Sequence, residues 1–305
     1  HYPLRRQRQM CIRDRIQATL KSQPANTVNG KIRITDQGEV IQQKYGYKPL
    51  AEYNLCSYLG AVMDASLNPP PKSKKKWRDL IQKMSEISTS AYRKNLNQSE
   101  DFIRYFKTVT PHKSLGKLAI GSRPTKRKNV DNIQSLRAIP WVFAWTQIRL
   151  MLPAWLGTTE ALRYGSIKKF SKTLTDMEKN WPYFVSTMDI LDMVISKVDP
   201  EISIIYENNL ADEALKRIGK KLRFQFKALV KLHNKITPKE VFKERKEFRK
   251  ALFIRNNYTE MLNILQANIM NKINNKKYKE LDKKFLDDAL MTSIAGISAA
   301  MKNTG

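Results

Sequence analysis

The stretch Trp77-Arg78-Asp79-Leu80-Ile81-Gln82-Lys83-Met84-Ser85-Glu86-Ile87 decides the fold class, because its apolar residues recur every three or four positions. That period places them on one face of a helix and the charged residues on the other. The residues that share the apolar face are Trp77, Leu80, Ile81, Met84 and Ile87. The stretch therefore predicts an amphipathic helix.

The same period extends in both directions along the chain. Asn68-Pro69-Pro70-Pro71 ends the first of these predicted helices, because proline cannot continue a helix. Helices are predicted over residues 51–67, 184–195, 210–232, 241–272 and 281–301. The chain is thus predicted to be mainly α.

Short apolar segments that resemble strands interrupt this helical pattern. They are Lys31 to Thr35, Leu118 to Gly121 and Ala138 to Phe143. A few short strands among long helices suggest a β/α architecture with a helical majority. In a β/α barrel, functional groups follow the strands. The residues in such positions are Arg33, Thr35, Asp36, Gln37, Ser122, Arg123, Arg137 and the range Trp145 to Arg149.

The charge of the chain invites a second interpretation. Its 305 residues contain 56 Lys and Arg against 28 Asp and Glu, a formal net charge of +28. A basic helical module that binds nucleic acid would explain this number, and so would a scaffold with no chemistry. However, the only dense cationic run is Lys72, Lys74, Lys75, Lys76 and Arg78.

Several classes of protein and site are disfavoured by simple counts. Two cysteines cannot supply a disulfide framework or a cysteine-based metal cluster. The most apolar stretch, Ala138 to Leu156, is broken by polar residues and falls short of a membrane helix. Glycine-rich phosphate loops, a nucleophile elbow and paired metal ligands are not recognisable in the sequence.

Two arginine-containing segments could bind an anion. Gly121 to Lys128 combines a glycine and hydroxyl groups with several cations, and Arg137 directly precedes an apolar run. A guanidinium group offers a bidentate fork to phosphate or carboxylate. These segments suggest an anionic small-molecule substrate, although Arg123 to Lys128 could equally be a solvated basic loop.

The two ends of the chain differ in character. Residues Arg8 to Arg15 look like a translated sequencing adaptor, so residues 1–15 are predicted to be non-native, with a basic natural N-terminus as the alternative. At the other end, Ala289 to Met301 is apolar almost to the last residue. We therefore expect the C-terminus, including Asn303, to be docked in the structure.

Taken in order, a set of longer motifs resembles phosphoenolpyruvate carboxylase over residues 16–305. The motifs are Gly30 to Ile41 with Lys44-Tyr45-Gly46, Leu118 to Arg127, Leu136 to Gln147, Leu152 to Gly157, Arg255 to Tyr258, and Asn303-Thr304-Gly305. Where the family pattern has Glu, this chain has Asp36.

This resemblance implies an activity and a setting. Family members carboxylate phosphoenolpyruvate with bicarbonate to give oxaloacetate and phosphate, which feeds the tricarboxylic acid cycle, and they use Mg²⁺ or Mn²⁺. They are cytoplasmic homotetrameric lyases built around a β/α barrel, and aspartate or malate inhibits them allosterically. The resemblance implies no specific nucleic acid and no membrane as partners.

The resemblance also assigns roles to particular residues. Arg123 and Arg137 match active-site arginines that bind substrate and phosphate, whereas Lys197, Arg255 and Asn303 match positions that hold the dicarboxylate inhibitor. The family's catalytic histidine, lysine and metal ligands would precede residue 16, so no metal or cofactor ligand is expected in this chain. We therefore expect residues 16–305 to be the last barrel strands and helical C-terminal region of a longer enzyme, inactive alone.

Overall fold

The computed structural model describes residues 16–33, 38–97, 100–117, 138–237, 246–276 and 282–301. Over these ranges all regular structure is helical, which confirms the mainly α prediction. The α-helices are α2 (Ile16–Lys21), α3 (Gly38–Tyr45), α4 (Lys48–Leu67), α5 (Lys75–Asn97), α6 (Glu100–Val109), α7 (Ala138–Gln147), α8 (Thr158–Gly165), α9 (Lys168–Asn180), α10 (Pro182–Ile195), α11 (Pro200–Leu210), α12 (Glu213–Ile236), α14 (Lys246–Asn274) and α15 (Lys283–Ala300). Two short 3₁₀ helices are η1 (Ser114–Lys117) and η3 (Leu152–Ala154).

The predicted strand over Ala138 to Phe143 is wrong, because these residues form the first turns of α7. A short apolar run has no periodicity that separates a buried strand from a buried helix. Pro140 lies in the first turn of α7, where its missing N–H group would have no intrahelical partner. Residues 31–33 have no regular structure, and the candidate strand at Leu118 to Gly121 lies outside the described residues.

The described chain divides into two compact units. The first comprises residues 84–163 and 191–301, and the second comprises residues 16–83 and 164–190. Helices α5, α8 and α10 each contribute residues to both units. No helix in the described part is both long and apolar enough to span a membrane.

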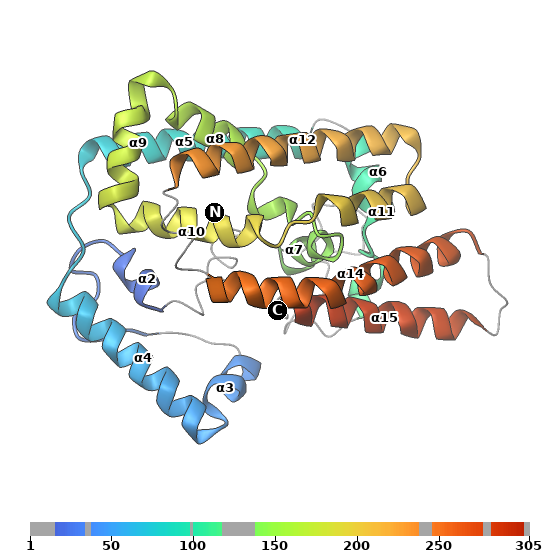
Figure 1. Ribbon diagram of the computed structural model, residues 1–305, viewed down its shortest axis with the longest axis horizontal. Coiled ribbons are helices and arrows are strands. Elements are labelled where there is room, and N and C mark those ends of the chain that lie inside the picture. The colour runs from blue at the N-terminus through green and yellow to red at the C-terminus, as the bar shows by residue number, and fades with distance from the viewer. Residues whose placement is uncertain are drawn as a thin grey trace. The chain divides into compact units, whose positions relative to one another are not determined.

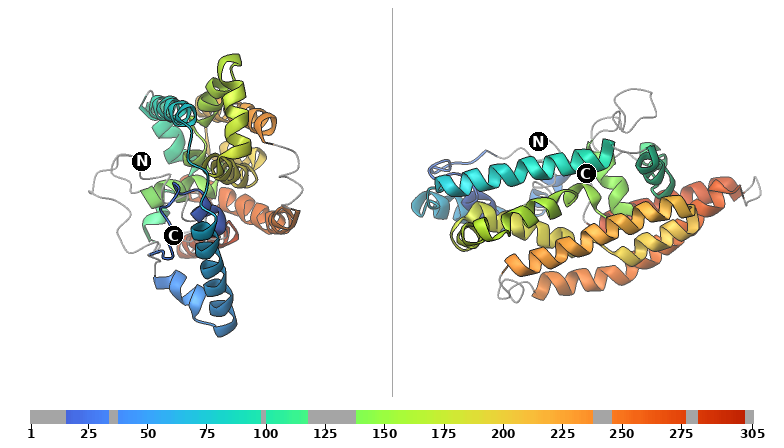
Figure 2. Two further views of the ribbon diagram at one scale, coloured as in Figure 1. Left: turned by 90° about the vertical axis from the view of Figure 1, so that its left-hand side faces the viewer. Right: turned by 90° about the horizontal axis from the view of Figure 1, so that it is seen from above.

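Helix α14 organises much of the first unit. It packs against α11 and α15, and α15 runs back alongside it (Figure 1). Figure 2 shows helices α14 and α15 from two further directions. Helix α11 also packs against α12 and α6, and α7 packs against α15. These contacts explain why the long helices are stable, since a buried face contributes more than intrinsic helix propensity.

An aromatic cluster joins α6 to α7 in the first unit. Phe106 packs against Trp141, with ring centroids 4.8 Å apart, and against Trp145 at 5.4 Å. Trp141 meets Trp145 edge to face. The indole N–H of Trp141 donates to the hydroxyl of Tyr92 at 3.0 Å. Aromatic pairs of this kind add stability beyond the apolar area that they bury.

A buried carboxylate lies where α11 approaches α12. Glu207 is 1% exposed, accepts a hydrogen bond from the Tyr105 hydroxyl at 2.8 Å, and pairs with Arg223. Burial, followed by the neighbouring Glu207, raises the pKa of Tyr105, which therefore stays a donor. A Cβ atom at Gly219 would lie 1.9 Å from Glu207 Oε1. Glycine at this helical position thus leaves room for the carboxylate.

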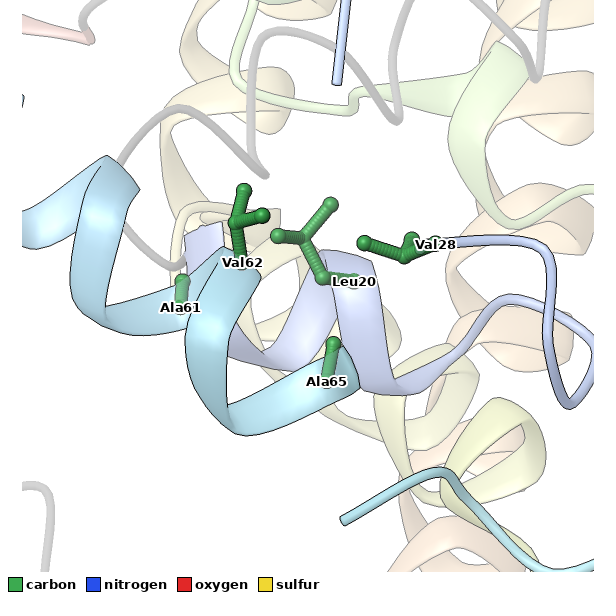
Figure 3. Close-up of a cluster of buried hydrophobic side chains, with 5 residues drawn as sticks. All are labelled: Leu20, Val28, Ala61, Val62 and Ala65. Carbon is green, nitrogen blue, oxygen red and sulfur yellow. The ribbon is translucent and has the colours of Figure 1, made fainter. Parts of the chain in front are cut away.

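The second unit contains a small apolar core between α2 and α4. Figure 3 shows its five side chains converging from the two helices and the following loop: Leu20, Val28, Ala61, Val62 and Ala65. Helix α3 also packs against α4. The small alanine side chains let the backbones of α2 and α4 approach closely.

A polar cluster fixes the start of α5 within the second unit. Asp176 accepts hydrogen bonds from Lys74 Nζ at 2.9 Å and from the Trp77 indole at 3.0 Å. Lys76 Nζ lies 3.0 Å from the same carboxylate. Trp77 stacks on Trp181 with ring centroids 5.6 Å apart. The basic run Lys72 to Arg78 is therefore partly neutralised within its own unit.

Candidate functional site

The structure places two of the five predicted site residues. Arg123 and Arg137 belong to residues 118–137, and Asn303 belongs to residues 302–305, so all three lie outside the described ranges. Their roles in binding phosphate and inhibitor stay predictions. Lys197 and Arg255 are described, and both belong to the first unit.

Lys197 lies in the turn that follows α10, and its side chain is half-buried. Its Nζ atom donates a hydrogen bond to the carbonyl oxygen of Met301 at 3.1 Å. Met301 caps α15 and is 1% exposed, so the described end of that helix is buried, as its apolar sequence predicts. A cation beside the carbonyl end of a helix is favoured by the helix dipole.

Arg255 lies in α14 and is also half-buried. Its backbone carbonyl accepts a hydrogen bond from the Thr259 hydroxyl at 2.7 Å. Asn256 follows it in the same helix and is half-buried as well. Helix α14 thus presents a cation and an amide at adjacent positions.

The side chain of Arg149 connects these two elements. Its Nε atom donates to the backbone carbonyl of Lys197 at 2.9 Å, and its Nη2 atom donates to Asn256 Oδ1 at 3.0 Å. Arg149 is fully buried. One planar guanidinium group therefore ties the Lys197 turn to the part of α14 that carries Arg255.

The backbone around Arg149 has an unusual conformation. Arg149 and Met151 both have positive φ, at 57° and 48°, although neither is glycine. The Leu150 carbonyl between them accepts a hydrogen bond from the Trp155 indole at 2.7 Å, and the Arg149 carbonyl accepts from the Asp199 N–H at 2.9 Å. A left-handed residue of this kind costs about 1–3 kcal/mol and persists only where its surroundings hold it.

Burial and neighbouring charges have opposite effects on the pKa of Arg149. Burial lowers the pKa of Arg149, whereas the charges of Asp199 and Glu260 raise it, and the net direction is downward. Arginine nevertheless keeps its proton at neutral pH because its intrinsic pKa is so high. The Asp199 carboxylate is already engaged as the N-cap of α11, where it accepts from Glu201 and Ile202.

A buried polar network lies next to Arg149 and joins four helices. Gln147 of α7 donates to Ser298 of α15 at 2.9 Å, and Gln266 of α14 donates to Gln147 Oε1 at 3.1 Å. Asn263 donates to the Gln147 carbonyl, and the Tyr206 hydroxyl of α11 donates to Gln266 at 2.7 Å. A buried network of hydrogen bonds between four helices holds these helices in one arrangement.

Arg149 is not among the residues to which the sequence motifs assign a role. It lies at the end of the range Trp145 to Arg149, which was expected to follow a strand, whereas the structure places this range at the end of a helix. The available signal was an arginine inside the apolar stretch Ala138 to Leu156. A charged residue in such a run is seldom fully buried unless it has partners.

The arrangement suits an anionic ligand better than a metal ion. Lys197 and Arg255 supply cations on two elements that Arg149 holds together. Among the described residues, no group of three or more His, Cys, Asp or Glu is placed to hold a metal. The chemistry that this part of the chain offers is therefore charge-assisted hydrogen bonding to carboxylate or phosphate.

A separate cleft of about 710 Å³ opens in the second unit. Its lining includes Lys21, Arg78 and Trp181. Lys21 is paired with Asp64 at 2.7 Å, and Arg78 donates to Ser73. These cations already have partners, and the cleft contains none of the predicted site residues.

The comparisons with known proteins agree over nearly the whole chain. The profile of a family described as phosphoenolpyruvate carboxylase matches residues 16–305. The chain belongs to the phosphoenolpyruvate carboxylase family. A phosphoenolpyruvate carboxylase of Hahella chejuensis is 42% identical over 285 residues, which cover 93% of this chain and 32% of the relative. One from Acinetobacter baumannii is 42% identical over 294 residues, which cover 95% of this chain and 33% of the relative.

The chain therefore spans about a third of the length of these carboxylases. A third example, from a Marinomonas species, is 41% identical over 285 residues, with the same shares of 93% and 32%. The family matches the resemblance seen in the sequence motifs. The matched range begins at residue 16, directly after the segment predicted to be non-native.

Proposed function

We propose that this chain is the C-terminal third of an enzyme that carboxylates phosphoenolpyruvate with bicarbonate to oxaloacetate and inorganic phosphate. The family match over residues 16–305 carries the proposal. In this reaction, a bicarbonate oxygen attacks phosphorus and the bond from phosphorus to the enol oxygen breaks, giving carboxyphosphate and an enolate. Carboxyphosphate then releases CO₂ and phosphate, and the enolate carbon bonds to CO₂.

In this proposal, Arg123 and Arg137 bind the substrate. Negative charge accumulates on phosphoryl and enolate oxygens during the reaction, and a fixed cation stabilises that charge most where water is excluded. Two guanidinium groups suit this task because they stay charged at any working pH and bind oxygens in pairs. Arg137 would lie toward the phosphate.

We place an inhibitory site for aspartate or malate at Lys197, Arg255 and Asn303. Two cations and an amide donor match two carboxylates. The hydrogen bond from Lys197 to Met301 supports this grouping, because Asn303 follows Met301 by two positions in the chain. The Arg149 contacts to Lys197 and Asn256 support it from the other side.

The remaining parts of the proposal concern the longer enzyme. Mg²⁺ or Mn²⁺ would supply Lewis-acid chemistry. Among the described residues, no group of three or more His, Cys, Asp or Glu could hold the ion, so we assign it no step here. We expect a cytoplasmic homotetramer in which the β/α barrel is completed by segments preceding residue 16. The alternative, a basic nucleic-acid-binding or scaffold module, explains the charge of +28 but not the family match.

The experiment compares two proteins for bicarbonate-dependent formation of oxaloacetate from phosphoenolpyruvate. One is the 305-residue chain, and the other is the enzyme obtained when the reading frame is extended upstream of residue 16 in the source DNA. We expect turnover from the extended enzyme and none from the chain alone, since the resemblance to the family assigns its catalytic histidine, lysine and metal ligands to positions before residue 16.

Two results would count against the proposal. An extended enzyme that does not consume phosphoenolpyruvate would overturn the assigned reaction. Turnover by the 305-residue chain would overturn the prediction that this chain is inactive alone. Sequence-selective binding of nucleic acid, with an affinity that falls steeply as the salt concentration rises, would instead favour the basic-module alternative.

A further inference from the structure

We propose that Arg149 is a positioning residue for the dicarboxylate site. Its guanidinium group fixes the Lys197 turn against α14, so that the cations of Lys197 and Arg255 are held at one separation. This inference rests on the proposed inhibitor site, and it adds a residue to which neither the sequence motifs nor the comparisons give a role.

The geometry of the guanidinium group carries the inference. Nε donates to the Lys197 carbonyl at 2.9 Å and Nη2 donates to Asn256 Oδ1 at 3.0 Å. These two donors belong to one rigid plane, so the two acceptors cannot move independently. A lysine at this position would keep the charge but could not hold both acceptors in that relation.

The third nitrogen of the group argues against a purely structural role. Nη1 of Arg149 is buried and has no hydrogen-bond partner among the described residues. A buried ion pair can often be replaced by apolar side chains without loss of stability. Burying a guanidinium group whose Nη1 atom makes no hydrogen bond costs folding free energy. The presence of Arg149 in this apolar stretch therefore calls for an explanation other than stability.

The backbone of the same segment points in the same direction. Arg149 and Met151 adopt left-handed conformations, and the Trp155 indole and the Asp199 N–H hold the intervening carbonyls. Strained backbone of this kind gathers at functional sites, where a fixed geometry is needed. Here that strain aims the Arg149 side chain at the Lys197 turn and α14.

The expected consequence concerns inhibition. A dicarboxylate bound by two cations needs both at a matched distance, so loosening one element weakens the binding of the second carboxylate. The net contribution of a hydrogen bond to a charged group corresponds to about tenfold or more in affinity. We expect loss of either Arg149 contact to raise the inhibitor concentration for half-inhibition roughly tenfold.

The test uses the full-length enzyme and four single variants: Arg149→Lys, Asn256→Ala, Lys197→Ala and Arg223→Lys. For each variant, the aspartate concentration that halves its own uninhibited rate is measured. Arg223→Lys is the matched control, because Arg223 belongs to the same unit and pairs with the buried Glu207 rather than with either hydrogen-bond partner of Arg149. We expect the first three variants to shift this concentration and Arg223→Lys to leave it within about twofold of the wild type.

The double variant Arg149→Lys/Asn256→Ala provides a readout that general destabilisation would not produce. Because both single changes remove the same hydrogen bond, the double variant should shift inhibition no further than Arg149→Lys alone. A change in the logarithm of the half-inhibition concentration equal to the sum of the two single-variant changes would overturn the proposed hydrogen bond between Arg149 and Asn256 as the common cause. If Arg149→Lys does not fold, the inhibition of Asn256→Ala alone tests the positioning role. This variant is expected to fold, because Asn256 is half-buried and contributes only a side-chain acceptor to the Arg149 contact.

The remaining outcomes separate this inference from the one on which it rests. If Lys197→Ala leaves inhibition unchanged, the proposed inhibitor site is wrong. If Lys197→Ala relieves inhibition while Arg149→Lys and Asn256→Ala do not, the site stands and the positioning role of Arg149 is wrong. An equal shift in Arg223→Lys would also overturn that role.

Discussion

Among single residues, Gly157 has the least room for change. Its φ is +85°, and a Cβ atom there would lie 2.3 Å from the backbone oxygen of Ser88. Both the conformation and the contact require glycine. The close approach allows the turn after η3 to pack against α5 within the first unit.

We expect Gly157→Ala to destabilise the chain by at least about 2 kcal/mol, because alanine disfavours this φ and its methyl group would displace backbone atoms. Urea denaturation of the two proteins measures the difference. Gly60→Ala in α4 is the control, because no heavy atom lies within 4 Å of the added Cβ. There we expect a neutral effect or a gain of about 0.5–1 kcal/mol. Equal losses at both positions would contradict the packing argument.

Asp176 makes the second unit sensitive to acid. Hydrogen bonds from Lys74, then from Asn180 and Lys76, lower the pKa of Asp176 well below its ordinary value. A carboxylate with a depressed folded-state pKa contributes stability that is present above the unfolded-state pKa and is lost as the pH falls towards the folded-state value.

We therefore expect the stability of the second unit to fall progressively below about pH 4. Asp176→Asn should lower its stability at pH 7 and remove most of that acid dependence. Denaturation at pH 7, 4 and 3 checks both points. Asp79→Asn is the control, since Asp79 is an exposed aspartate of the same unit. An unaltered acid profile in Asp176→Asn would contradict the role assigned to this cluster.

At the scale of elements, α4 is unusual because its outer face is apolar. Leu55, Leu59, Met63 and Leu67 recur every four residues and are 57%, 62%, 52% and 74% exposed. The opposite face supplies Ala61, Val62 and Ala65 to the small core of Figure 3. A continuous exposed stripe of this kind promotes association.

We expect Leu59→Gln/Met63→Gln to raise the soluble fraction of the 305-residue chain, because the change interrupts the stripe without adding charge. Centrifugation and light scattering of freshly prepared protein measure that fraction. Val62→Gln, on the buried face of the same helix, should have the opposite effect because it places an amide in the apolar core. An unchanged soluble fraction in the double variant would show that the stripe does not drive association.

Helix α7 shows why elements differ in how well the sequence predicts them. Helices α4, α5, α10, α12, α14 and α15 each contain a repeat of three or four residues, and each overlaps its predicted range, although α5 continues past Ile87 to Asn97. Residues 138–143 are apolar at every position, so the sequence contains no period to interpret. Their helical form depends on the aromatic residues of α6 and on α15, which cover more than one face.

At the scale of the whole molecule, the proposed reaction separates two kinds of variant. In the full-length enzyme, Arg137→Ala should lower turnover by orders of magnitude, because it removes a cation from the phosphate that is transferred. Lys197→Ala should instead relieve inhibition by aspartate. Rates with and without aspartate distinguish the two effects.

Arg163→Ala provides the control for charge alone, since Arg163 is exposed in α8 and belongs to the same unit. It should change neither turnover nor inhibition by more than about twofold. Unchanged turnover in Arg137→Ala would overturn the assignment of this arginine to the active site.

The sequence by itself determined the family, the helical class and the positions of the six longest helices, whereas shorter ones such as α6, α8, α9 and α11 had no predicted range. Long motifs and helical periods are local properties of the chain, so they can be recognised without any knowledge of distant contacts. The candidate cations Lys197 and Arg255 could also be named from the resemblance to the family, without the structure.

Only the tertiary structure decided that Arg149 joins those two elements, that residues 138–143 are helical, and which face of α4 is buried. Each depends on residues far apart in the chain: Arg149 contacts partners 48 and 107 positions away. A buried arginine and an exposed one look the same in a sequence, because burial and hydrogen-bond partners arise only when the helices pack.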